Sequence, residues 1–215
     1  MSQEINHVII DPVAPGGGTS SPIDTTGANV ILFLIVQDFA NSFSPSDNQG
    51  NSYSASVGRA EPGLNAKFGI FYLLNPTTSA SHTFTITGGG LSAGIVIALR
   101  TAISADATTT GNGTASGTTV QAGSVTPGGS PAMVVSGMCY SGAVGATDSI
   151  DLGFTSYDNP LVGSVHYGCA LGYKFQAAAA AINPTWTCSS TADLAAVNMT
   201  FVMANDSRVQ GHVFG

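Results

Sequence analysis

The stretch Val30-Ile31-Leu32-Phe33-Leu34-Ile35-Val36 decides the fold of this chain. It has no polar residue, and it is far shorter than the roughly 20 residues that a membrane-spanning helix needs. Side chains of a strand alternate between the two faces of its sheet. A run that is apolar at every position therefore predicts a strand, within residues 29–37, that is covered on both faces.

Other segments alternate apolar and small or polar residues, which is typical of a strand with one face in the core. In the segment 165–175, one face carries the large residues and the other carries Gly168, Ala170 and Gly172. The large residues are Val165, Tyr167, Cys169, Leu171, Tyr173 and Phe175. The same pattern predicts strands at 5–11, 52–57, 67–74, 82–87, 93–100, 133–140, 149–154, 185–188 and 195–204.

The remaining segments have the composition of turns and loops. Residues 108–129 are rich in Gly, Ser and Thr, and we expect a long loop there with one edge strand at 118–122. Residues 46–53 predict a β-hairpin turn in which Gly50 has positive φ. The five alanines 177–181 are too few for a stable helix, and we expect at most one helical turn.

Regularly spaced strands with Gly and Pro turns predict an all-β fold. We expect an antiparallel β-sandwich of jelly-roll type with about ten to twelve strands, formed by residues 1–215 as a single domain. Residues 1–22 and 205–215 are expected to extend as arms that clasp a neighbouring subunit.

The composition excludes several kinds of partner. Only 8% of the 215 residues are charged, the net charge is −7, and there are five Lys and Arg in all. So few cations cannot neutralise a phosphate backbone or form the basic patch that anionic lipid attracts, so we expect neither nucleic acid nor membrane as a partner. Residues 1–11 lack the pattern of a signal peptide, which predicts synthesis and folding in a host cytoplasm.

The three cysteines Cys139, Cys169 and Cys188 form no CxxC pair. We expect three reduced, buried thiols, with Cys169 filling the core. A Cys139–Cys169 or a Cys169–Cys188 bridge stays open as an alternative.

No residue pattern of an enzyme or of a metal site is present. There is no Gly-x-Ser-x-Gly elbow, no pair of carboxylates stands out, and the four histidines His7, His82, His166 and His212 are isolated in the sequence. Asp47, Gln49 and Asn51 alternate as in a calcium loop, but the terminal Glu of that motif is missing. We therefore expect no catalytic residues, no metal and no cofactor.

Aromatic residues in loops are the remaining candidates for ligand binding, because their rings can stack on sugars. Trp186 and Tyr167 are expected in the core. Tyr157 lies in a polar segment, Thr155-Ser156-Tyr157-Asp158-Asn159-Pro160, that reads as a loop. Tyr157, Asp158 and Asn159 are therefore the predicted ligand contacts.

Several stretches together resemble small β-sandwich proteins that are encoded by tailed bacteriophages and environmental bacteria. The stretches that carry the resemblance are 23–29 (Ile-Asp-Thr-Thr-Gly-Ala-Asn), 47–53 (Asp-Asn-Gln-Gly-Asn-Ser-Tyr), 71–76 (Phe-Tyr-Leu-Leu-Asn-Pro), 81–88 (Ser-His-Thr-Phe-Thr-Ile-Thr-Gly) and 183–186 (Asn-Pro-Thr-Trp). The resemblance covers residues 20–204 and specifies the fold far better than the function.

The resemblance implies a protein on the virion surface, either a capsid decoration (cement) protein or a tail component. Its partners would be the major capsid protein or another virion protein, and a symmetric homo-oligomer, a trimer, is expected. The small-residue face of Gly168, Ala170 and Gly172 would admit either a second chain or a loop of the same chain. The alternatives are a carbohydrate-binding module, such as the receptor-binding part of a tail fibre, and a hydrolase with a carboxylate pair in a cleft.

Overall fold

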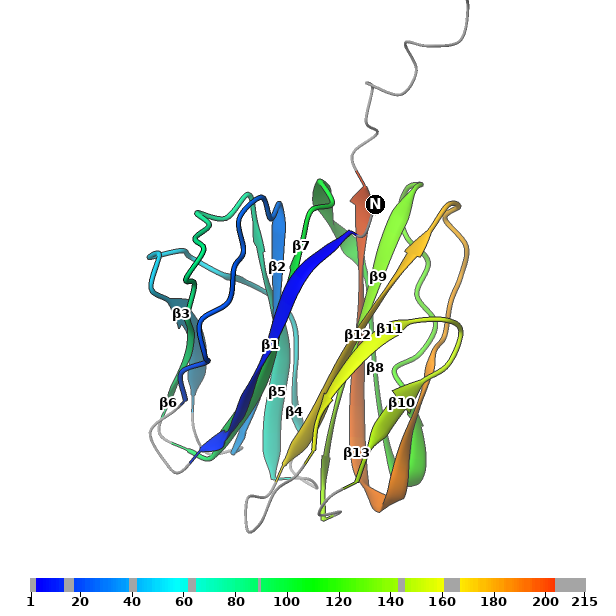
Figure 1. The fold of residues 1–215 in the computed structure, drawn as a ribbon. Helices are drawn as coiled ribbons and strands as arrows, with labels where there is room; N and C mark the ends of the chain where they lie inside the picture. Colours follow the sequence, from blue (N-terminus) through cyan, green and yellow to red (C-terminus); the bar gives the residue numbers. More distant parts are fainter. Residues whose placement is uncertain are drawn as a thin grey trace, which may run out of the picture.

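In the computed structural model, the described residues are 3–13, 18–38, 42–61, 65–88, 90–142, 146–160 and 167–203. These residues form thirteen strands and no helix, and every strand pairing is antiparallel. Two larger sheets pack face to face (Figure 1), so the predicted all-β sandwich is confirmed. No helical segment among the described residues has the length and hydropathy of a membrane span.

The first sheet has five strands. In spatial order they are β1 (Glu4–Val13), β7 (Ser92–Leu99), β2 (Val30–Asp38), β5 (Ala66–Leu74) and β4 (Ser54–Glu61). The apolar run Val30–Val36 lies in the central strand, β2, and every side chain of this run has 0% exposure.

The second sheet is built around β9 (Ala132–Ser141), which pairs with β13 (Thr185–Met203) on one side and β12 (Gly168–Gln176) on the other. Beyond β12 lies β11 (Thr155–Asn159), and beyond β13 lies β8 (Ile103–Gln121). The short strand β10 (Asp148–Ile150) pairs with the first residues of β13.

The main core lies between the two larger sheets. Alternate residues of β2 and β7 point into it from the first sheet. From the second sheet it receives residues of β9, β12 and β13, including Cys169, Leu171 and Tyr173, together with Tyr167, which directly precedes β12. The face predicted for the segment 165–175 is thus the core face wherever the structure describes it.

A separate small layer covers the outer face of the first sheet. Strands β3 (Phe43–Asp47) and β6 (Phe84–Gly88) pair with each other, and Phe84 and Ile86 pack on Ile31, Phe33 and Ile35 of β2. Both faces of β2 are therefore buried, as the apolar run predicts. Strand β3 was not expected, and its last two residues fall in the polar segment 46–53 that was predicted as a turn. That turn joins strands of different sheets, so it is not the predicted hairpin, although Gly50 has the predicted positive φ of 73°.

The segment 108–129 is not the predicted long loop, because most of it belongs to the 19-residue strand β8, whose last residues coincide with the edge strand predicted at 118–122. β8 and β13 form a ribbon whose ladder is interrupted between Thr187 and Ala192. The ribbon folds back over the second sheet at this interruption. Trp186 therefore lies over the middle of β9, where its indole N–H donates to the Ser136 hydroxyl (2.7 Å). A Cβ on Gly113 would collide with the Gln121 carbonyl oxygen, so the glycines that read as loop residues allow this close approach.

The folded part of the ribbon forms an outer layer on the second sheet, opposite to the β3–β6 layer (Figure 1). Val120, Trp186 and Leu194 pack there with Met138 and Tyr140 of β9. β9, like β2, is therefore buried on both faces.

Two further expectations need correction, and one holds. Of the expected N-terminal arm, residues 1–22, the strand β1 pairs with β7 and Thr19 bridges to Thr85, so the described residues of this segment belong to the sandwich. The five alanines 177–181 are exposed and include no helical turn, which is consistent with the expectation of at most one. Residues 149–154 hold the end of β10 and a turn rather than one strand. The expected arm at 205–215 lies outside the described residues.

Candidate functional site

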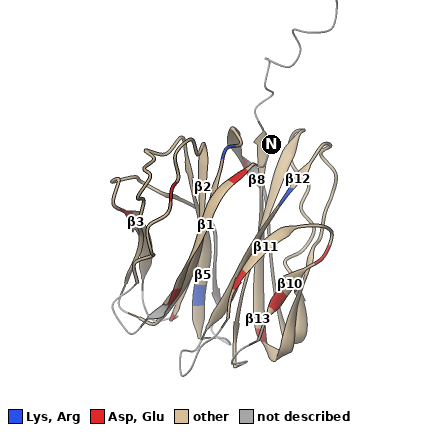
Figure 2. Ribbon diagram, in the orientation of Figure 1, with Lys and Arg blue, Asp and Glu red and all other residues tan. Residues whose placement is uncertain are grey.

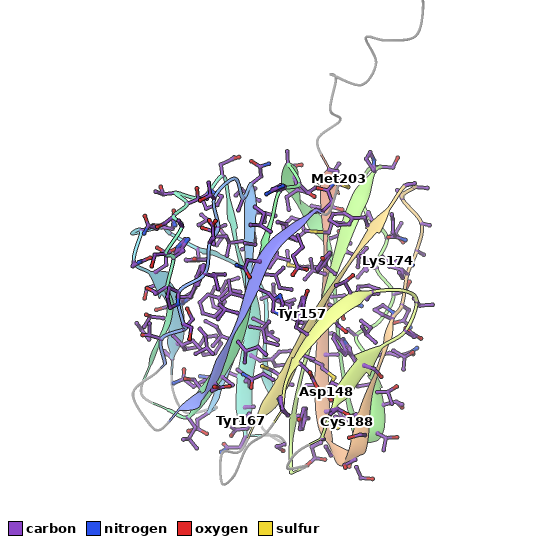
Figure 3. The ribbon with its side chains drawn as sticks, in the orientation of Figure 1. Asp148, Tyr157, Tyr167, Lys174, Cys188 and Met203 are labelled. Carbon is purple, nitrogen blue, oxygen red and sulfur yellow. The ribbon has the colours of Figure 1, made fainter. Side chains whose placement is uncertain are left out.

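The predicted ligand contacts Tyr157, Asp158 and Asn159 lie together, but in a strand rather than a loop. They belong to β11, which pairs residue by residue with β12 at the edge of the second sheet. β11 faces β1 of the first sheet, so this segment closes one side of the sandwich (Figure 3).

Tyr157 is held by residues of β1. Its hydroxyl donates to Glu4 Oε1 (2.6 Å), and its ring stacks on His7 with 3.7 Å between centroids. The other oxygen of Glu4 accepts a hydrogen bond from Tyr173 (2.7 Å), and His7 Nδ1 lies 3.0 Å from Glu4 Oε1. Burial, and then the hydrogen bond and charge of Glu4, raise the pKa of both phenols, so Tyr157 and Tyr173 stay protonated donors.

The other two predicted residues are also engaged within the chain. Asn159 is 1% exposed, and its amide donates to the carbonyl oxygens of Ile10 (2.9 Å) and Gly94 (3.4 Å). Asp158 accepts a hydrogen bond from the backbone N–H of Asp148 (3.2 Å). The three side chains thus join β11 to β1, β7 and β10.

A second polar cluster is centred on Asp47, at the end of β3. Its Oδ1 accepts the backbone N–H groups of Gln49 (2.9 Å) and Asn51 (3.1 Å), which forms the turn after β3. Its Oδ2 accepts the Asn51 amide (2.9 Å) and the Tyr53 hydroxyl (2.7 Å). The backbone of Asp47 is partly exposed, but its side chain is not exposed at all. The calcium-like spacing of Asp47, Gln49 and Asn51 is therefore explained by hydrogen bonds within the protein.

His82 extends this cluster towards the segment before β2. Its Nε2 lies 3.2 Å from Asp47 Oδ2, its Nδ1 lies 2.9 Å from Thr25 Oγ1, and its ring stacks on Phe84. Burial raises the pKa of Asp47, but the hydrogen bonds from Tyr53, Asn51 and His82 outweigh it and hold that pKa below its ordinary value. Asp47 is therefore a stable carboxylate that fastens the β3–β6 layer.

The order hydroxyl, imidazole, carboxylate in Thr25, His82 and Asp47 is that of an acyl-transfer triad. A triad needs its hydroxyl oxygen at a surface that the substrate can reach. Thr25 and His82 are both 0% exposed, and the Thr25 hydroxyl also exchanges hydrogen bonds with the backbone of Ser79 (3.2 Å each). This geometry suits a structural brace and offers no access for a substrate.

Sequence reasoning missed this cluster because its members are far apart in the chain. His82 lies 35 residues after Asp47 and 57 after Thr25, and the segment 81–88 reads only as a half-exposed strand. The one available signal was the alternation of His82, Phe84 and Ile86, which places the imidazole on the same buried side as the Phe84 and Ile86 side chains of β6.

Other predicted residues lie where the sequence placed them. Trp186, Tyr167 and Cys169 are buried, all three cysteines are free, and Cys139 lies directly opposite Cys169 without a bond to it. The small residues Gly168, Ala170 and Gly172 are covered by the same chain, through Tyr140, the outer core layer and Ser156. His166 and His212 lie outside the described residues.

Figure 2 shows that Lys, Arg, Asp and Glu residues are sparse over the whole described part of the fold. Within the described ranges, no three His, Cys, Asp or Glu side chains are grouped so that they could hold a metal ion. No family model matches this chain, and no curated protein or solved structure gives a significant match to it.

Proposed function

We propose that this chain is a non-enzymatic structural protein of a tailed-phage virion, and specifically a capsid decoration protein on the particle surface. The observation that carries the proposal is that the chemically reactive side chains serve to hold the fold together. Glu4, Tyr157, Asp47 and His82 join one layer of the fold to another instead of lining an exposed site. Such hydrogen bonds between layers suit a protein whose shape must resist mechanical force.

The edges of the sandwich support an assembly role. β8 is 19 residues long and pairs, among the described strands, with β13 alone; β4 likewise pairs only with β5. Edge strands of monomeric proteins are usually protected by Lys, Pro or short length. β8 contains no Lys or Pro, and its only charged residue, Asp106, accepts hydrogen bonds from Gly128 and Thr200. An edge of this kind suits contact with a neighbouring subunit or with the major capsid protein.

The first test is the molar mass of the purified protein by light scattering at several concentrations. We expect a closed oligomer, with a mass three times that of one chain, that persists on dilution. Co-sedimentation with phage capsids that lack their decoration protein should then show saturable binding. A strict monomer that does not sediment with any capsid would contradict the proposal.

A glycan array on the same sample distinguishes the carbohydrate-binding alternative. A sugar that stacked on the ring face of Tyr157 covered by His7 would have to displace His7. Binding that is lost in Tyr157→Ala but kept in Tyr53→Phe would replace the capsid proposal with a receptor-binding role.

A further inference from the structure

A pair of carboxyl groups, from the first residue of β10 and from β11, lies between these two strands. No part of the proposed function uses this pair. Asp148 is the first residue of β10, and its backbone N–H donates to Asp158 Oδ2 of β11 (3.2 Å). On its other side Asp148 is directly opposite Cys188 of β13 (Figure 3). The pair thus lies between the outer layer, which holds β10, and the edge strand β11.

The carboxyl group of Asp148 is buried without adequate donors. Neither of its oxygens is exposed, and among the described residues no nitrogen or oxygen donates a hydrogen bond to either of them. The thiol of Cys188 interacts with it, but a thiol is a weak donor. A buried carboxylate without donors is costly, whereas the neutral acid is not.

The described titratable groups around Asp148 offer no positive charge. β11 contributes Asp158, β13 contributes Cys188, and β12 contributes Cys169, which senses the charge of both aspartates. Burial, and then the negative charge of Asp158, raise the pKa of Asp148 to about 7, and the Cys188 thiol offsets this only in part. The group therefore changes charge near neutrality.

We propose that Asp148 and Asp158 form a pH-sensitive latch, which keeps β10 on β13 while Asp148 is neutral and weakens this attachment when Asp148 ionises. The segment that opens is defined by its hydrogen bonds to β13. Thr147 and Ser189 exchange bonds at one end, and Asp151 and Thr185 do so at the other. Opening uncovers Cys188, which is 1% exposed when β10 is in place. The inference does not rest on the proposed function.

Hydrogen exchange of the intact protein tests the latch directly. The opening equilibrium of residues 147–151 should rise with pH from about 4 to about 7 and then level off, because the open segment ionises at the ordinary pKa of 3.8 and the closed one at about 7. After correction for intrinsic exchange, the protection of these amides should fall on the order of 50-fold between pH 5 and pH 7.5. Amides of β2 serve as the internal reference.

Two variants test whether the ionisation of Asp148 causes the pH dependence of this protection. Asp148→Asn keeps the shape and removes the titration, so the protection of 147–151 should no longer depend on pH. Asp158→Asn removes only the neighbouring charge, so a reduced dependence should remain. An equal fall in the wild type and in Asp148→Asn would overturn the proposal, as would protection that does not change between the two pH values in the wild type.

Discussion

Two buried aspartates on opposite outer layers of this protein behave in opposite ways. Asp47 closes the β3–β6 layer, and Asp148 starts β10 in the layer on the other side (Figure 1). Both carboxyl groups are removed from water, but Asp47 accepts four hydrogen bonds and lies beside His82. Among the described residues, the carboxyl group of Asp148 has one donor, the weak thiol of Cys188.

The comparison shows that donors, and not burial alone, set the sign of a pKa shift. The pKa of Asp47 is lowered, so its contribution to stability is present above its ordinary pKa and is lost as the pH falls through the lowered value. The pKa of Asp148 is raised to about 7. Its cost is therefore absent at low pH, grows as the pH rises from the ordinary value towards 7, and is constant above that.

The largest expected effect is that of Asp47→Ala. It leaves the donors of Asn51, Tyr53 and His82 buried without an acceptor, so the free energy of unfolding at pH 7 should fall by about 3–5 kcal/mol. Urea unfolding followed by fluorescence measures this. The matched control is Asp24→Ala, because Asp24 is exposed and its hydrogen bonds come from the neighbouring Thr26, whose backbone N–H lies 2.8 Å away. A control loss as large as that of Asp47→Ala would break the comparison.

Asp148→Asn should have the opposite sign. At pH 8 it removes a buried charge, and the free energy of unfolding should rise by about 2–4 kcal/mol, whereas at about pH 3, below the ordinary pKa, the variant and the wild type should be nearly equal. Unfolding curves at the two pH values measure the difference. A variant that is less stable than the wild type at pH 8 would show that the carboxylate of Asp148 is stabilised after all.

Tyr53→Phe makes Asp47 more similar to Asp148, because it removes one donor and leaves the ring in place. We expect a loss of about 1–2 kcal/mol at pH 7. The acid unfolding midpoint should also move to higher pH, since the remaining donors hold the pKa of Asp47 less firmly. Circular dichroism during acid titration follows this midpoint, and an unchanged midpoint would exclude Tyr53 as a determinant of that pKa.

Cys188→Ser makes Asp148 more similar to Asp47, because a hydroxyl is a better donor than a thiol. The pKa of Asp148 should fall, with a change in stability of less than about 1 kcal/mol. An NMR titration of the Asp148 carboxyl carbon measures it. A pKa that stays near 7 would mean that the serine hydroxyl bonds elsewhere, for instance to the backbone near Ser190, whose N–H interacts with Cys188.

The sequence predicted more of the fold than of the polar clusters. The run Val30–Val36 shows that β2 is covered on both faces, because every position in it is apolar. The alternation from Tyr167 to Phe175 likewise identifies the core face of β12. Most of β8, apart from the edge strand predicted at 118–122, was missed because its Gly, Ser and Thr residues have no apolar periodicity. Its hydrogen bonds come from β13, which begins 64 residues after β8 ends.

By itself, then, the sequence determined the all-β class and the doubly covered strand, because these depend on local pattern and composition. It favoured buried thiols but left a disulfide open, and only the structure shows Cys139, Cys169 and Cys188 to be free. Only the tertiary structure decided which polar groups meet. Glu4 reaches Tyr157 across 153 residues, and Thr25 reaches His82 across 57. A hydrogen bond depends on positions in space to within a fraction of an ångström, and strand order sets those positions. The same strand order left Asp148 beside Asp158 without a strong donor, which no local pattern could have shown.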